Sequence, residues 1–102
     1  MDLCQAQEAV DAWIRQHGGY WDKFQILARL SEELGEVASA LQRVEGLRPH
    51  KKEVDLAGEV GDLLFTLAAF ANANGLDLDA CLRKSFDKYD SWDGAAWKAQ
   101  DR

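Results

Sequence analysis

The sequence has little cysteine, histidine or proline, and these shortages exclude several classes of protein. It contains two cysteines, Cys4 and Cys81, two histidines and a single proline among 102 residues. The cysteines form no CxxC pair and no disulfide ladder, which favours a reducing compartment. The N-terminal residues lack a charged-then-apolar leader pattern, and no apolar stretch suits a membrane span. We therefore expect a cytoplasmic protein without membrane contact.

Positive charge is also scarce. Lys and Arg number 12 against 18 Asp and Glu, which gives a net charge of −6. A basic stripe that could follow a phosphate backbone is absent, so we expect no nucleic-acid partner. An acidic protein can still bind an anionic substrate if metal ions lie between the two.

The sequence does contain helical periodicity, broken by short turns and free of strand-type alternation. It predicts helices over residues 3–16, 23–44, 53–74 and 78–89. Asp22 and Asp77 are suitable N-caps for the second and fourth helices, and Gln25 can complete a capping box with Asp22. We expect one all-α domain over residues 1–102, an antiparallel bundle of about four helices completed by dimerisation. Trp92 and Trp97 predict that part of the C-terminal tail also packs.

The second and third helices each carry an apolar stripe. We expect these stripes to form the core of an antiparallel helix pair joined by the connection 45–52. Phe65 lies on the far side of the third helix, which predicts a second packing surface between subunits. The two stripes are Leu27, Leu30, Leu34, Val37, Ala38 and Leu41, and Leu56, Val60, Leu63, Leu64, Leu67, Phe70 and Ala71.

The same two helices carry an acidic constellation. Glu33 and Glu36 share one helix face, as do Glu59 and Asp62, because each pair is spaced i,i+3. In an antiparallel pair all four carboxylates lie within about one turn of helix, a rise of ~4.5 Å. Like charges so placed repel one another unless a cation lies between them. Small neighbours on the third helix leave room for a ligand: Thr66, Ala69 and Ala73.

Hard oxygen ligands favour Mg²⁺, Mn²⁺ or Ca²⁺. Neither His17 nor His50 forms ExxH with these glutamates, which argues against a di-iron carboxylate bundle. The spacing also differs from that of an EF-hand loop. The competing interpretation is a solvated acidic surface in which Arg29 pairs with Glu33.

Two segments resemble the MazG family of all-α nucleoside triphosphate pyrophosphohydrolases. They are LSEELGEVASAL at 30–41 and EVGDLLFTLAAFANANGLDL at 59–78. The family motif EExxE, a spacer and ExxD corresponds here to Glu32-Glu33-x-x-Glu36, 22 intervening residues and Glu59-x-x-Asp62. The resemblance covers the second and third helices well and extends weakly over 19–88. The combined motif is specific, whereas each half alone is common.

The resemblance implies hydrolysis of a nucleoside or deoxynucleoside triphosphate to the monophosphate and pyrophosphate. It implies Mg²⁺ as cofactor, with Mn²⁺ as a substitute, held by Glu33, Glu36, Glu59 and Asp62. Glu32 would orient or deprotonate the attacking water, bind an additional metal, or support the ligands. We take Glu32 as the candidate catalytic residue.

The resemblance also implies substrate contacts and self-association. Trp21 would stack on the base, and Asn72 would hydrogen-bond the base or sugar, although Asn72 could instead cap its helix. Lys84 and Lys88 would contact phosphates. Asp90 and Trp92 stand where relatives have Asn and Arg, which puts the phosphate contacts in doubt. Relatives are dimers or tetramers, so we expect a homodimer or homotetramer.

A second hypothesis comes from a different functional class. The altered motif on the fourth helix is compatible with a non-catalytic module that keeps the scaffold. Such a module would be a metal-stabilised oligomer or a partner-binding domain.

Overall fold

The structure is a computed structural model that describes residues 1–49 and 53–91. It contains four helices in these ranges: α1 (Leu3–Gln16), α2 (Lys23–Val44), α3 (Leu56–Ala73) and α4 (Leu78–Ser91). No strand occurs in the described residues, so the expected all-α class is confirmed. The expected packing of the tail around Trp92 and Trp97 lies outside the described residues.

The helix ends follow local capping chemistry. The predicted bounds of α1 and α2 are confirmed, and Asp22 and Gln25 form the expected capping box. α3 begins three residues later than predicted, because Asp55 is its N-cap and accepts a hydrogen bond from the Gly58 amide at 2.9 Å. At α4, Asp77 accepts from the Asp79 amide at 2.9 Å, and the helix continues two residues beyond the predicted end.

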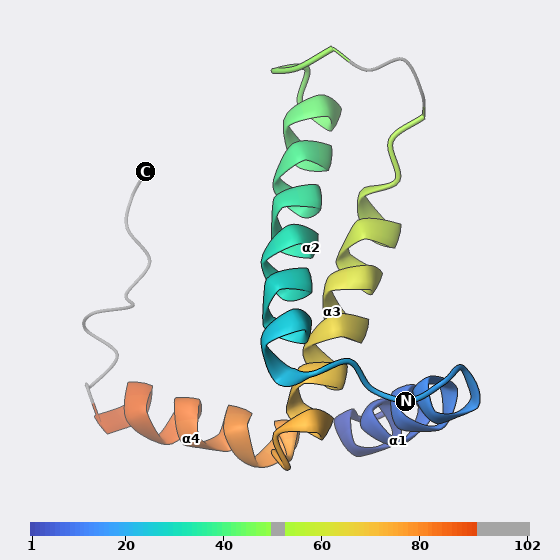
Figure 1. The fold of residues 1–102 in the computed structure, drawn as a ribbon. Helices are drawn as coiled ribbons and strands as arrows, with labels where there is room; N and C mark the ends of the chain where they lie inside the picture. The colour runs from blue at the N-terminus through green and yellow to red at the C-terminus, as the bar shows by residue number, and fades with distance from the viewer. Residues whose placement is uncertain (50–52, 92–102) are drawn as a thin grey trace.

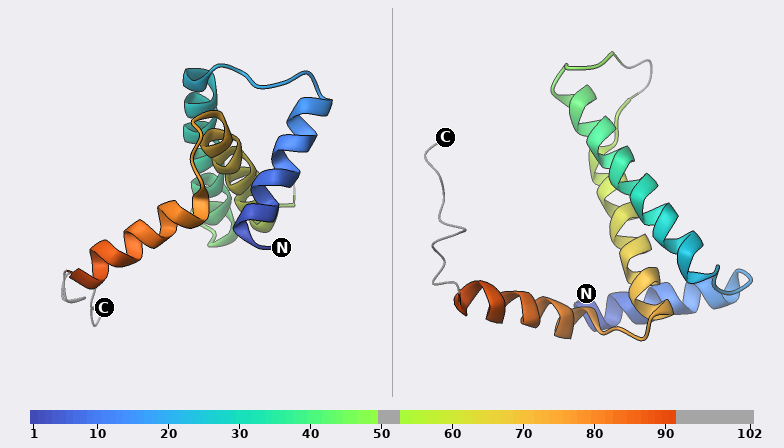
Figure 2. Two further views of the ribbon diagram at one scale, coloured as in Figure 1. Left: turned by 90° about the horizontal axis from the view of Figure 1, so that it is seen from below. Right: turned by 60° about the vertical axis from the view of Figure 1, so that its left-hand side comes forward.

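The helices form an antiparallel hairpin with two attachments. α2 and α3 run alongside each other in opposite directions, and α1 lies across the end where α2 begins and α3 ends (Figure 1). α4 contacts α1 and projects away from the hairpin (Figures 1 and 2). By length and composition alone α3 could also cross a membrane. Within the chain α3 packs against both α1 and α2, and it carries the acidic residues Glu59 and Asp62.

The core lies where α1 crosses the hairpin. It joins Val10 of α1, Ile26 of α2, and Ala68 and Ala69 of α3. Small residues of α3 let the three helices approach closely at this point. Partly buried apolar side chains surround them: Ile14, Tyr20, Phe70, Ala73 and Leu78.

The hairpin does not bury the two predicted apolar stripes in full. Ile26, Glu33 and Ala40 are the buried residues of α2, spaced seven apart, and they form its seam with α3. Leu34 follows Glu33 by one residue and therefore lies ~100° around the helix, outside the seam. Six stripe residues, here called the outer apolar face, are between 38% and 59% exposed: Leu27, Leu34, Leu41, Val60, Leu64 and Leu67. The prediction that these six form the core is wrong for the single chain.

The outer apolar face and Phe65 lie on opposite sides of α3. Leu67 and Phe65 are two residues apart, which separates them by ~200° around the helix. The Phe65 ring meets the Trp13 ring edge to face, with centroids 5.5 Å apart. The predicted second packing surface therefore exists, and α1 of the same chain packs on it through Trp13. A subunit contact at Phe65 stays a prediction.

Candidate active site

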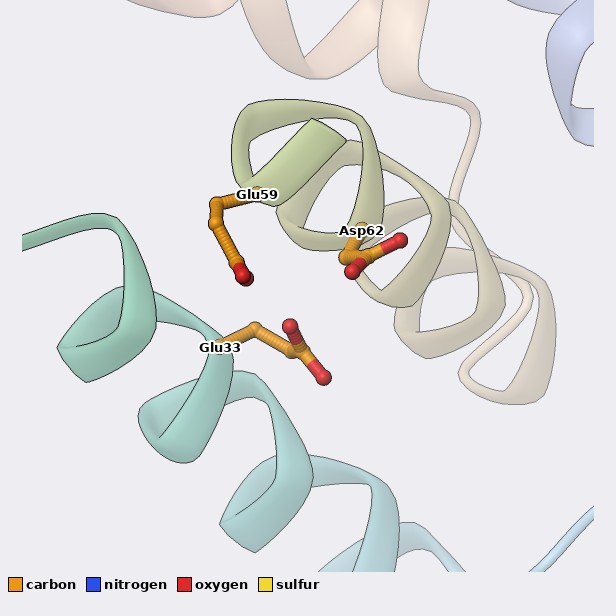
Figure 3. A group of neighbouring side chains, drawn as sticks. All are labelled: Glu33, Glu59 and Asp62. Carbon is orange, nitrogen blue, oxygen red and sulfur yellow. The ribbon is translucent and has the colours of Figure 1, made fainter. Parts of the chain in front are cut away.

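Three carboxylates converge in the space between α2 and α3. Glu33 points from α2 toward Glu59 and Asp62 of α3 (Figure 3). One carboxylate oxygen from each residue lies within 4.8 Å of those of the other two. Here we call Glu33, Glu59 and Asp62 the carboxylate cluster. The prediction that the carboxylates lie at the same height along two antiparallel helices is confirmed for these three residues.

The carboxylate cluster brings negative charges close together between two helices, where hydration is reduced. Glu33 is only 4% exposed, and its carboxylate forms an ion pair with Arg29 Nη2, which lies 2.6 Å away. Loss of hydration raises the pKa of Glu59, and the negative charges of Glu36 and Asp62 add to the effect. A raised carboxyl pKa means that the charged form is disfavoured in the metal-free protein. A bound cation would relieve this repulsion.

The donor set of the cluster fits a hard divalent cation. All the available ligand atoms are carboxylate oxygens, and no histidine or cysteine belongs to the group. Oxygen-only sites of this kind suit Mg²⁺, Mn²⁺ or Ca²⁺ better than softer metals. The cluster could therefore hold a metal ion through Glu33, Glu59 and Asp62.

Two other predicted acidic residues lie outside this cluster of three. Glu36 is close enough to act on the charge of Glu59, but it is not one of the three converging residues. Glu32 is largely exposed and accepts a hydrogen bond from Arg29 at 3.2 Å. A ligand role for Glu36 and a water-activating role for Glu32 stay predictions.

A pocket of about 480 Å³ adjoins the carboxylate cluster. Its polar lining includes Glu33, Asp62 and Arg29, and Thr66 and Ala69 provide the room that their small size predicted. Its other lining is mostly aromatic and comes from α1, the segment after it, and α3: Trp13, His17, Tyr20, Trp21 and Phe65. The pocket thus joins a charged surface suited to phosphates with an aromatic wall suited to a flat ring.

Hydrogen bonds and stacking hold the aromatic wall in place. The His17 ring stacks on Trp13 at 3.9 Å, and its Nδ1 donates to the Trp13 carbonyl oxygen at 2.7 Å. The Tyr20 hydroxyl donates to Asp11 at 2.5 Å. This hydrogen bond and that from Arg15 lower the pKa of Asp11, whereas burial and the bond to Asp11 raise the pKa of Tyr20. Residues of α1 therefore hold the aromatic wall in place.

The predicted substrate residues fall in different places. Trp21 lines the pocket and is 60% exposed, so its ring is accessible to a ligand. Asn72 instead joins helices: it accepts from Gln7 Nε2 at 2.9 Å and donates to the Gln7 carbonyl oxygen at 3.0 Å. Gln7 also accepts from the Leu78 amide at 2.7 Å, which links α1 to the start of α4. Nucleotide contacts by Trp21 and Asn72 stay predictions.

The two predicted phosphate-binding lysines lie on α4. Lys84 and Lys88 are not among the pocket-lining residues, and their helix projects away from the hairpin (Figure 2). Arg29 is the one Lys or Arg among the described residues that line the pocket. Phosphate contacts by Lys84 and Lys88 stay predictions.

Sequence reasoning missed the pocket roles of three aromatic residues and of one arginine. Trp13, His17 and Phe65 carry the aromatic wall, and Arg29 was considered only as a surface pair of Glu33. The i,i+4 spacing of Trp13 and His17 was a signal for one shared helix face. It did not show that this face meets α3, because that contact depends on how α1 crosses the hairpin.

Comparison with known proteins agrees with this architecture. Residues 23–94 match the MazG nucleotide pyrophosphohydrolase domain. The chain is 32% identical over 99 residues to the uncharacterized protein YpjD of Bacillus subtilis strain 168, covering 93% of this chain and 89% of YpjD.

Two solved structures share the fold. One is the crystal structure of YpjD from Bacillus subtilis, described as a candidate pyrophosphatase, with a TM-score of 0.78, 32% identity, and coverage of 87% of this chain and 95% of that one. The other is the Bacillus-conserved MazG protein, a nucleotide pyrophosphohydrolase, with a TM-score of 0.76, 31% identity, and coverage of 87% and 89%. The chain belongs to the MazG nucleotide pyrophosphohydrolase family.

Proposed function

We propose that the protein hydrolyses a nucleoside or deoxynucleoside triphosphate to the monophosphate and pyrophosphate, with Mg²⁺ as cofactor and Mn²⁺ as a substitute. The observation that carries this proposal is one pocket lined by two residues of the carboxylate cluster, Glu33 and Asp62, and by an aromatic wall. A nucleotide needs both surfaces, since it joins a polyanion to a flat heterocycle.

The cation would be held by Glu33, Glu59 and Asp62, with Glu36 as a neighbouring fourth carboxylate. When bound, Mg²⁺ neutralises phosphate charge and makes water a better nucleophile. Glu32, which precedes Glu33 in the sequence, would orient that water or take up its proton. Trp21 and the stacked pair Trp13 and His17 hold the base, which fixes the triphosphate beside the carboxylates.

Self-association is the second part of this proposal. The outer apolar face leaves six large aliphatic residues between 38% and 59% exposed on one hairpin. Contiguous apolar surface of this kind marks interaction sites in folded proteins. A second copy would bury it, so we propose a homodimer, or a homotetramer built from two dimers.

The reaction is tested by measuring product release from a panel of nucleoside and deoxynucleoside triphosphates. With Mg²⁺ we expect pyrophosphate and a nucleoside monophosphate, and with EDTA we expect neither. Release of orthophosphate would contradict the pyrophosphohydrolase reaction. A folded, metal-binding protein that releases nothing from any nucleotide would favour a non-catalytic binding module.

A further inference from the structure

The geometry points to a second role for Arg29. We propose that Arg29 holds Glu33 in the metal-free protein and, once a divalent cation occupies the carboxylate cluster, turns to bind a phosphate oxygen of the substrate. This inference rests on the proposed function, because it concerns the same pocket. It assigns the pocket a phosphate-binding residue that the family motif does not contain.

The contacts of Arg29 show its first role. Arg29 Nη2 lies 2.6 Å from the Glu33 carboxylate, and Arg29 Nη1 lies 3.2 Å from Glu32. The Glu33 side chain is 5% exposed, whereas that of Arg29 is 50% exposed. A buried carboxylate without a partner is costly, and no other described side chain forms an ion pair or hydrogen bond with Glu33. Arg29 therefore supplies the positive charge that Glu33 needs when no cation neutralises it.

The charge around the pocket shows why Arg29 is needed again with substrate. No Lys or Arg occurs in 30–42 or in 53–78, the stretches of α2 and α3 that carry the acidic residues. Among the described pocket-lining residues Arg29 is the one permanent cation. A triphosphate is a polyanion, so a guanidinium already in the pocket can neutralise part of its charge beside a bound cation.

Arg29 cannot pair with Glu33 while a cation holds that carboxylate, so the two roles of Arg29 follow one another. A divalent cation and the guanidinium compete for the same carboxylate oxygens, so a bound cation weakens the hold of Glu33 on Arg29. The guanidinium presents several donors in a planar fork that suits a phosphate group. Because Arg29 is half exposed and lines the pocket, it can change partners by side-chain rotation alone.

Two binding measurements on Arg29→Ala test the proposal without relying on turnover. The first is titration of the nucleotide-free protein with Mn²⁺, followed by the loss of the free-ion EPR signal. The second is binding of a non-hydrolysable α,β-imido nucleoside triphosphate with Mg²⁺, followed by tryptophan fluorescence, since Trp13 and Trp21 line the pocket.

The two affinities should move in opposite directions. Removing the competitor for Glu33 should tighten Mn²⁺ binding by about twofold to fivefold, in line with the modest strength of half-exposed ion pairs. Losing a charge-assisted phosphate contact should weaken analogue binding by about tenfold to hundredfold. Arg83→Ala is the matched control, because it removes an i,i+4 ion pair with Asp79 on α4 and should change neither affinity.

Equal weakening of both affinities would overturn the proposal in favour of a purely structural ion pair, and so would unchanged analogue binding. Should Arg29→Ala fail to fold, Arg29→Lys keeps a cation beside Glu33 but lacks the fork. It should then bind the analogue at least about threefold more weakly than the wild type, and wild-type analogue affinity would overturn the proposal. If Arg29→Ala shifts both affinities as expected but the wild type releases no pyrophosphate, the proposed reaction is refuted and the role of Arg29 stands.

Discussion

The two sides of the α2–α3 hairpin reverse the usual distribution of polar and apolar residues. On the pocket side a carboxylate, Glu33, is 4% exposed, whereas Leu34, the next residue, belongs to the outer apolar face and is 59% exposed. A single folded chain gains nothing from exposing leucine and burying a charge. The difference is explained if each side of the hairpin binds a partner: a cation with its substrate on one side, and a second copy of the chain on the other.

The largest expected effect comes from disrupting the pocket side alone. Glu59→Gln removes one charge from the carboxylate cluster while keeping the side-chain shape. Nucleotide hydrolysis should fall by about a thousandfold or more, since metal-assisted charge stabilisation carries much of such catalysis. The measurement is pyrophosphate release per mole of protein. Glu45→Gln, which neutralises an exposed glutamate at the end of α2, is the control that should remain active. If Glu59→Gln also kept its activity, the carboxylate cluster would not be the active site.

The next effect comes from disrupting the outer side alone. Leu34→Glu places a charge in the middle of the outer apolar face and should weaken self-association by about a hundredfold or more, because burying an unpaired charge is costly. Sedimentation velocity over a range of protein concentrations would show the shift. Ala28→Glu adds the same charge to α2 outside this face and should leave assembly unchanged. A wild-type chain that sediments as a monomer at all concentrations would refute the assignment of this face.

A smaller effect is expected where α1 attaches to the hairpin. Asn72→Ala removes two side-chain hydrogen bonds to Gln7, and it should lower the free energy of unfolding by about 1–3 kcal/mol. Urea denaturation followed by circular dichroism gives this quantity. If the unfolding free energy is unchanged while the KM for nucleotide rises, Asn72 is instead the substrate contact that the family resemblance implies.

The smallest effect is a pH dependence of stability that arises on the pocket side. The raised pKa of Glu59 means that the folded state holds its proton more tightly than the unfolded state. Its contribution to stability is therefore complete below the unfolded value, about 4.3, and is lost as the pH rises through the raised folded value. In EDTA, the stability of Glu59→Gln relative to the wild type should increase across this window.

Chemical denaturation at several pH values would measure that difference. Mg²⁺ should reduce it, because a bound cation favours the charged carboxylate of the wild type. The lowered pKa of Asp11 acts with the opposite sign and at lower pH, so the two contributions are separable. A stability difference that does not vary with pH would contradict the electrostatic explanation.

The sequence predicts what is local or follows from simple symmetry. The bounds of α1 and α2 and the capping box of Asp22 depend on neighbouring residues, and they were correct. The approach of Glu33 to Glu59 and Asp62 follows from equal distances along an antiparallel hairpin, so it could also be foreseen. In both cases the deciding contacts are short in sequence or fixed by the connection.

The sequence does not predict which side of the hairpin is buried. Both a leucine-rich face and a carboxylate-bearing face are available on α2, and hydrophobicity alone favours the leucines. The outcome depends on small residues of α3, such as Thr66 and Ala69, which let α2 approach with Glu33 in the seam. Nothing local likewise shows that Trp13 of α1 reaches Phe65.

The division of the pocket between helices also has an evolutionary consequence. The carboxylates come from the hairpin, whereas Trp13 and His17 come from α1, a separate element joined on by Gln7 and Asn72. Under the proposed function, substitutions in α1 would change which base is accepted while Glu33, Glu59 and Asp62 stay where they are. One scaffold can in this way acquire a new nucleotide preference without having to rebuild its chemistry.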